Sequence, residues 1–143
     1  MERLIEFAGN HLFLVSLFFA ILVLLVWNLY GSLISGITQL EPPEVIRMMN
    51  HEHAAIIDIR SSADFESGHI LHAMNIPDSE LNQKLKELGK YQKKPLIVYC
   101  ENGSVTGHAI RSLKTSGFEN VYGLKGGIAA WRSATLPLAR GGE

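Results

Sequence analysis

Residues 96–106 read LIVYCENGSVT, and this stretch decides the fold. The run LIVY at 96–99 is short, apolar and rich in β-branched and aromatic residues, which is typical of a strand buried on both faces. Gly103 then marks a tight loop, and the residues from Thr106 onward are expected to form a helix. The pattern predicts a strand, a loop and a helix in succession, with Cys100 at the carboxyl end of the strand.

Strands and helices alternate on both sides of this unit. Buried strands are predicted at 54–59, at 73–76 and near 121, and helices from 43, over 78–89, from 106 to about 116 and over 128–133. In the helix at 78–89, Asp78 is the expected N-cap, and the core face carries Leu81, Leu85 and Leu88. Such alternation predicts a three-layer α/β domain with a mainly parallel central sheet, whose ligands bind at the carboxyl ends of strands.

An apolar segment precedes this domain. From Leu12 to Tyr30 only Ser16 and Asn28 are polar, and these nineteen residues would span roughly 28 Å as a helix. Trp27 and Tyr30 lie at one end, where aromatic rings favour the level of the lipid headgroups. The segment therefore predicts one uncleaved N-terminal transmembrane helix.

The expected organisation follows from that helix. It comprises a short tail at 1–11, the transmembrane helix at 12–30, a linker at 31–40, the α/β domain at 41–137 and a flexible tail at 138–143. Near the helix, Arg3 and Arg47 give almost no charge bias, but the short and slightly acidic N-terminal tail is easy to translocate. We expect a single-pass protein of the inner (cytoplasmic) membrane, with its domain facing the cytoplasm.

Charge and cysteine content exclude several functions. The chain has 13 basic and 14 acidic residues, so it lacks the positive field of a nucleic-acid-binding protein. One cysteine cannot form an intramolecular disulfide or a cysteine-based zinc site. The spacings of His51, His53, His69 and His72 lack matching acidic or thiolate partners. We expect no metal, no cofactor and no nucleic-acid partner.

Cys100 is the candidate reactive residue. A lone cysteine is most often a small buried apolar residue, but this one ends a strand and begins a loop that leads into a helix. The backbone N–H groups of such a loop can converge on the sulfur, and the positive end of the helix stabilises a thiolate. The candidate loop consists of Glu101, Asn102, Gly103, Ser104, Val105 and Thr106.

Three ordered blocks of residues carry a resemblance to a known family. They are Asp58-Ile59-Arg60 with Gly68-His69-Ile70 and Ala73-Met74-Asn75-Ile76-Pro77, then Val98-Tyr99-Cys100 with Gly103, then Gly117-Phe118 and Leu124-Lys125-Gly126-Gly127 before Trp131. Over about 41–137 the chain resembles the rhodanese-like sulfurtransferases. The resemblance implies a rhodanese-like fold in which Cys100 accepts a sulfane sulfur, becomes a persulfide and passes the outer sulfur to a nucleophile. Asp58 and Arg60 resemble the charge pair that braces the active loop of that family from beneath.

The loop also departs from the family pattern. Val105 stands where the family commonly carries arginine, and Glu101 is expected to add a negative charge beside the sulfur. The lost contact and the repulsion would each cost an anionic donor about 1 to 3 kcal/mol. We therefore expect poor use of thiosulfate and better use of persulfides. Thr106 stands where the related phosphatases carry their arginine, which argues against phosphatase chemistry.

Three functions remain open on the sequence. The first is a membrane-tethered sulfurtransferase, with thiols or proteins as sulfur donor and acceptor. The second is a catalytically vestigial rhodanese fold that docks another membrane protein. The third is a thiol redox sensor, which requires a second thiol from another molecule. Replacement of Cys100 separates the first two, since docking alone would survive it.

Overall fold

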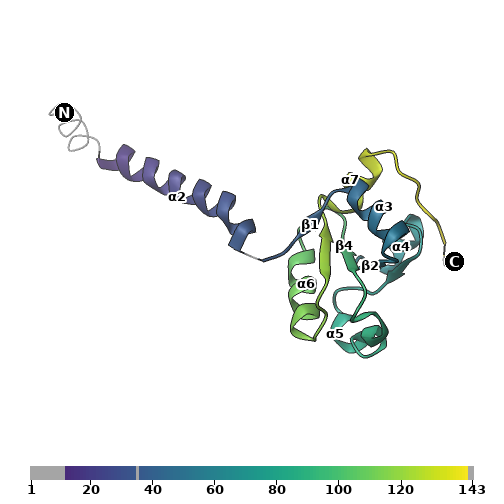
Figure 1. Ribbon diagram of the computed structural model, residues 1–143. Helices are drawn as coiled ribbons and strands as arrows, with labels where there is room; N and C mark the ends of the chain where they lie inside the picture. The colour runs from purple at the N-terminus through teal and green to yellow at the C-terminus, as the bar shows by residue number, and fades with distance from the viewer. Residues whose placement is uncertain (1–11, 35, 142–143) are drawn as a thin grey trace. The chain divides into compact units, whose positions relative to one another are not determined.

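A computed structural model describes residues 12–34 and 36–141 (Figure 1). The side chains of residues 27–34, which include the aromatic pair Trp27 and Tyr30, lie outside this description. The expected tail at 1–11 also lies outside it. The chain divides into two compact units, Met1–Gly36 and Ile37–Glu143, and each is treated by itself.

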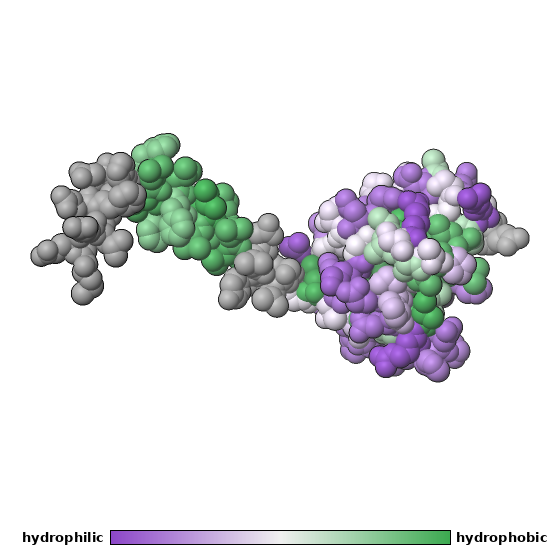
Figure 2. All heavy atoms as spheres, turned by 90° about the horizontal axis from the view of Figure 1, so that it is seen from above, coloured by the Kyte–Doolittle hydropathy of each residue, from purple (hydrophilic) through white to green (hydrophobic). Residues whose placement is uncertain are grey.

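The first unit contains helix α2 (Leu12–Ile34), which is longer than the expected 12–30. From Leu12 to Val26 the large apolar side chains of this helix are exposed, apart from Val15, which is half-buried, and Figure 2 shows this apolar surface in green. The Ser16 hydroxyl donates to the Phe13 carbonyl at 2.9 Å, which satisfies a polar group within the helix itself. In the part of the chain described, no helix is both long and apolar enough to cross a membrane. The transmembrane helix stays a prediction.

The second unit is built on a five-stranded parallel sheet in the order β1-β5-β4-β2-β3. The strands are β1 (Gln39–Leu40), β2 (Ala55–Asp58), β3 (Ala73–Asn75), β4 (Leu96–Tyr99) and β5 (Val121–Leu124). The four longer strands confirm the predicted ones. β1 falls in residues 31–40, which the sequence predicts as a linker, and it pairs with β5.

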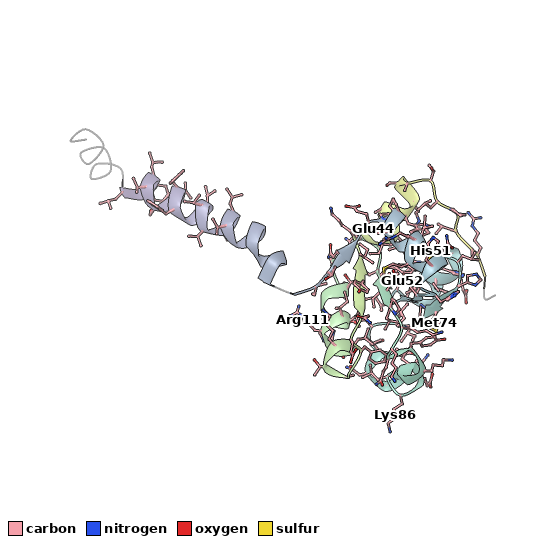
Figure 3. All side chains as sticks on the ribbon, viewed as in Figure 1. Glu44, His51, Glu52, Met74, Lys86 and Arg111 are labelled. Carbon is pink, nitrogen blue, oxygen red and sulfur yellow. The ribbon has the colours of Figure 1, made fainter. Side chains whose placement is uncertain are left out.

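Helices cover both faces of the sheet, which confirms the three-layer α/β fold (Figure 1). They are α3 (Pro42–His51), α4 (Ser62–Ser67), α5 (Leu81–Lys84), the 3₁₀ helix η1 (Glu87–Tyr91), α6 (Thr106–Thr115) and α7 (Gly127–Ser133). Alternate residues of β4 face opposite layers: Val98 packs with α5, η1 and α6, whereas Ile97 and Tyr99 pack with α3 and α7. Charged side chains such as Lys86 and Arg111 point away from the sheet (Figure 3).

The helix predicted over 78–89 is broken into two short pieces, α5 and η1. Asp78 is not the N-cap, because residues 78–80 form a turn and α5 begins only after Glu80. The Asp78 amide donates to the Ile59 carbonyl at 3.2 Å. The apolar pattern still marks the core face, since Leu81 and Leu88 are buried. The prediction of one continuous helix is therefore wrong, although its buried face is correct.

The sequence predicts a flexible tail at 138–143, of which residues 142–143 lie outside the described part of the chain, and the structure shows contacts between the domain and the preceding residues. Ala139 and His69 exchange two backbone hydrogen bonds, at 2.9 and 2.8 Å. Leu138 packs against the buried cluster around Trp131, whose indole N–H donates to the Pro137 carbonyl at 3.1 Å. These contacts hold the segment through Ala139 against the domain.

Candidate active site

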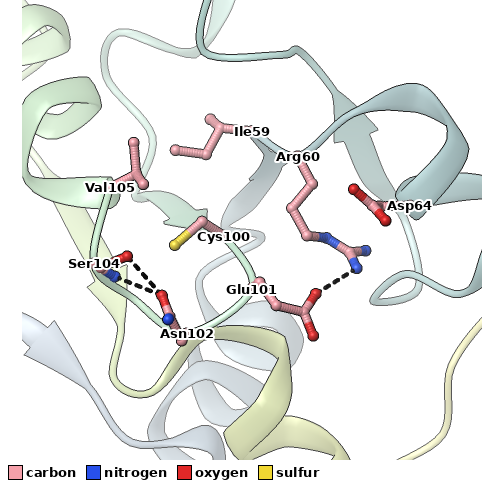
Figure 4. Close-up of a pocket in the computed structure, with 8 residues that line it drawn as sticks. All are labelled: Ile59, Arg60, Asp64, Cys100, Glu101, Asn102, Ser104 and Val105. Atoms are coloured by element: carbon pink, nitrogen blue, oxygen red, sulfur yellow. Dashed lines mark hydrogen bonds and ion pairs between the residues drawn. The ribbon is translucent and has the colours of Figure 1, made fainter.

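Cys100 lies where the sequence predicts it, directly after β4 at the carboxyl end of the sheet. It is 5% exposed, and its sulfur faces into the loop that leads to α6 (Figure 4). The sequence predicts that loop amides surround this sulfur, and the Gly103 N–H donates to Sγ at 3.1 Å. The loop therefore provides a hydrogen-bond donor for negative charge on the sulfur.

Side chains within the loop fix its shape. The Thr106 hydroxyl donates to the Gly103 carbonyl at 2.8 Å, and the Asn102 side-chain oxygen accepts from the Ser104 amide and hydroxyl at 3.2 and 2.6 Å. Gly103 has a φ of 86°, in the left-handed region that glycine adopts without strain. These residues thus position the Gly103 amide beside Cys100.

The start of α7 supports the loop from the other side. The amides of Ile128 and Ala129 donate to the carbonyls of Cys100 and Glu101, both at 3.0 Å. Gly127 has a φ of 60°, and a Cβ there would overlap the Cys100 carbonyl oxygen. Gly127, the second residue of the double glycine that carries part of the family resemblance, therefore lets α7 bind the backbone of the loop.

Asp58 and Arg60 form a buried ion pair beneath the loop. The Asp58 side chain is fully buried, and its Oδ2 lies 2.7 Å from Arg60 Nη2, while Arg60 Nε donates to Oδ1 at 3.0 Å. Arg60 Nη2 also donates to the Gly68 carbonyl at 2.8 Å. Burial alone would lower the pKa of Arg60, but the hydrogen bonds and charge of Asp58 more than offset it, so the pKa is raised. This geometry fits the predicted bracing role.

Tyr99 connects that pair to the core. Its ring is buried under the Arg60 guanidinium, 5.8 Å from ring centre to Cζ, and its hydroxyl accepts from the Ile70 amide at 3.1 Å. Burial, and then the nearby charge of Asp58, raise the pKa of the Tyr99 hydroxyl above its ordinary value. Tyr99 therefore stays neutral in the folded protein well into alkaline solution.

Glu101 lies differently from what the sequence predicts. Its carboxylate turns away from the sulfur toward Arg60 (Figure 4), with Oε2 3.1 Å from Arg60 Nη1. Its other oxygen, Oε1, accepts from Arg132 Nη1 at 2.7 Å. The expected charge beside the sulfur is thus held by two guanidinium groups. Arg132 is a site residue that sequence reasoning missed, since it lies 31 positions away on α7.

A pocket of about 360 Å³ opens over Cys100 (Figure 4). Its lining residues are Ile59, Arg60, Asp64, Cys100, Glu101, Asn102, Ser104 and Val105. Val105 is 49% exposed, so its side chain presents an apolar surface at the loop position where the family pattern has arginine. Asp58 and Thr106 are not among the lining residues and act from behind the pocket. Across residues 12–34 and 36–141, no three His, Cys, Asp or Glu side chains gather as a metal site requires.

Comparison with known proteins gives consistent similarities. The model of the rhodanese-like domain family matches residues 41–134. The chain is 34% identical over 142 residues to the uncharacterized protein YibN of Escherichia coli (strain K12), covering 99% of each chain. It is 31% identical over 100 residues to the thiosulfate sulfurtransferase GlpE of Shewanella oneidensis, covering 70% of this chain and 97% of that protein. A rhodanese-related protein from Thermoplasma volcanium superposes with a TM-score of 0.64 at 25% identity, covering 71% and 97% of the two chains.

Proposed function

This chain belongs to the rhodanese-like domain family, and from that premise we propose that it is a sulfurtransferase that carries sulfane sulfur as a persulfide on Cys100. The observation that carries the proposal is the Gly103 amide, which donates to Sγ at the floor of an open pocket. A cysteine that serves only as packing needs neither a pocket nor a donor at its sulfur. Both features favour chemistry at this residue.

The proposed reaction has two balanced halves. In the first, the Cys100 thiolate attacks the outer sulfur of a donor persulfide, and the donor leaves as a thiolate with the electron pair of the broken S–S bond. In the second, an acceptor nucleophile attacks the outer sulfur of the Cys100 persulfide. The S–S bond breaks, and Cys100 Sγ becomes a thiolate again with the electron pair of that bond. Negative charge stays at or next to Sγ in both halves, where the Gly103 amide can donate to it.

We propose thiol or protein persulfides as the donors. GlpE of Shewanella oneidensis is named for thiosulfate, whereas here the apolar Val105 occupies the expected arginine position and Glu101 lines the pocket. An oxyanion donor needs cationic or N–H partners, which these two side chains do not supply. A persulfide donor needs no such clamp, and Ile59 and Val105 offer apolar contact to its carbon chain.

The test is the intact mass of the purified full-length chain after incubation with a low-molecular-weight persulfide. We expect a gain of one sulfur atom that is lost on reduction and absent from Cys100→Ser. Thiosulfate should add sulfur far more slowly. If neither donor adds mass while Cys100 still alkylates, the sulfurtransferase proposal fails.

A second candidate function is a binding module that docks another membrane protein. The exposed side chain of Val105 favours it, since an apolar group at the mouth of the pocket suits protein contact. Under this alternative, Cys100→Ser would leave docking intact and Val105→Asp would abolish it. Under sulfur transfer, Cys100→Ser abolishes the function.

We also propose that the first unit tethers the domain to the inner membrane, with the domain in the cytoplasm. The support is the apolar sequence from Leu12 to Tyr30 and the exposed apolar side chains of α2. Cys100 is the one cysteine of the chain, so labelling by a membrane-impermeant maleimide shows on which side of the membrane the domain lies. Labelling only after lysis supports the proposal, and labelling in intact cells contradicts it. Release of the chain from membranes by alkaline carbonate would contradict the tether itself.

A further inference from the structure

Arg60 divides its donors between the core and the pocket. Nε and Nη2 bind the buried carboxylate of Asp58, and Nη2 also binds the Gly68 carbonyl. Nη1 points the other way, toward the pocket that Arg60 lines with Cys100. It is therefore placed to bind an anion that enters this pocket. Glu101 Oε2 already occupies that place, at 3.1 Å.

The carboxylate of Glu101 is held there from two directions. Arg132 Nη1 binds the second carboxylate oxygen at 2.7 Å, and the amide of Ala129 binds the Glu101 backbone carbonyl at 3.0 Å. Arg132 and Ala129 both belong to α7, so one helix fixes the backbone and the side chain of the residue next to Cys100. An incoming anion would have to displace Oε2 from Arg60 Nη1 while Arg132 holds Oε1 of the same carboxylate.

The charges around the pocket do not favour such displacement. The ionised side chains at the pocket and directly behind it are Asp58, Asp64, Glu101, Arg60 and Arg132. The three carboxylates outnumber the two guanidinium groups. Loss of the Glu101 charge would leave two carboxylates and two guanidinium groups, and would free the Nη1 donors of Arg60 and Arg132.

We infer that Glu101 determines donor choice, because its carboxylate occupies the anion position at Arg60 Nη1 and so excludes oxyanion donors from the pocket. This inference rests on the proposed sulfur transfer at Cys100. It assigns the exclusion of thiosulfate to an occupied guanidinium group as well as to the absent loop arginine. With thiosulfate, the Cys100 thiolate would attack the outer sulfur, the S–S bond would break, and sulfite would leave with the electron pair. Binding of the sulfonate oxygens is the step that Glu101 blocks.

The first test compares Glu101→Gln with Glu119→Gln in the full-length chain. Glu119 is exposed and precedes β5, whereas Cys100 follows β4, so the two residues lie at opposite ends of neighbouring parallel strands. The Glu119 variant makes the same change in net charge. The readout is the ratio of the loading rate with thiosulfate to that with cysteine persulfide. We expect Glu101→Gln to raise this ratio about tenfold through lower KM for thiosulfate, as one freed charge-assisted contact allows. A ratio equal to that of Glu119→Gln overturns the inference.

The second test needs no sulfur transfer. Sulfate should slow the alkylation of Cys100 by iodoacetamide in Glu101→Gln, and should have little effect in the wild type and in Glu119→Gln. Equal protection in all three proteins overturns the inference. If neither donor loads any variant, the proposed function fails, and the alkylation result still decides whether Glu101 blocks an anion position. Glu101→Ala replaces Glu101→Gln in both tests if the latter does not show a cooperative thermal transition.

Discussion

Two carboxylates share the guanidinium group of Arg60, and they differ in almost everything else. The Asp58 side chain is fully buried and takes the Nε and Nη2 donors, whereas the Glu101 side chain is 53% exposed and takes Nη1. A buried charge left without its partner is costly, while an exposed ion pair contributes little. One arginine thus binds a carboxylate of the core with Nε and Nη2 and a carboxylate of the pocket with Nη1, and we propose that the first contact serves folding and the second donor choice.

The largest loss of stability should come from removing Asp58, the buried partner of Arg60. Asp58→Ala leaves the Arg60 guanidinium buried without a counter-ion, and we expect a loss of about 3 to 5 kcal/mol in the free energy of unfolding. Urea denaturation measures it. Asp58→Asn keeps the shape and tests whether the charge matters. A loss below about 1 kcal/mol in Asp58→Ala would show that the pair does not brace the fold.

A smaller effect should follow from Tyr99→Phe, which removes the hydroxyl beneath the buried pair. The Ile70 amide loses its acceptor, so we expect a loss of about 1 to 3 kcal/mol at neutral pH. Because the folded pKa of Tyr99 is raised, the wild type keeps this proton at a pH where the unfolded chain releases it. The wild type therefore loses this part of its stability above about pH 10, and the difference between the two proteins narrows there. A constant difference across that range would contradict the assignment.

The smallest effect on stability should come from the exposed ion pair between Glu101 and Arg132. A double-mutant cycle with Glu101→Ala and Arg132→Ala should give a coupling free energy below about 1 kcal/mol. Salt should weaken it further, because both side chains are about half exposed. A coupling above about 2 kcal/mol would place this pair with the buried one and remove the contrast between them.

The sequence predicts the parts of this site that depend on local patterns. The apolar run before Cys100 and the glycine after it predict β4, the loop and the start of α6, and the structure confirms all three. Arg132 could not be found in this way, because its contact with Glu101 depends on how α7 packs beside the loop. A carboxylate next to a cysteine likewise carries no local signal of the direction in which its side chain turns.

The same limit explains the errors elsewhere in the fold. The helix predicted at 78–89 has the right apolar spacing, but residues 78–80 form a turn whose first amide binds the distant Ile59 carbonyl, and the helix begins only after Glu80. β1 and the segment at Ala139 are held by pairing with distant backbone, at Gly123 and His69. Short segments without a strong periodic pattern gain structure only from such partners.

The most direct measurement is a single cycle of sulfur transfer through the full-length chain. Cysteine persulfide labelled with heavy sulfur is the donor, the chain is freed of donor, and a thiol acceptor is then added while intact mass is followed. We predict that the chain gains one heavy sulfur on Cys100 and passes it to the acceptor, and that Cys100→Ser does neither. No gain in mass on an alkylatable Cys100, or equal transfer by Cys100→Ser, would contradict the account.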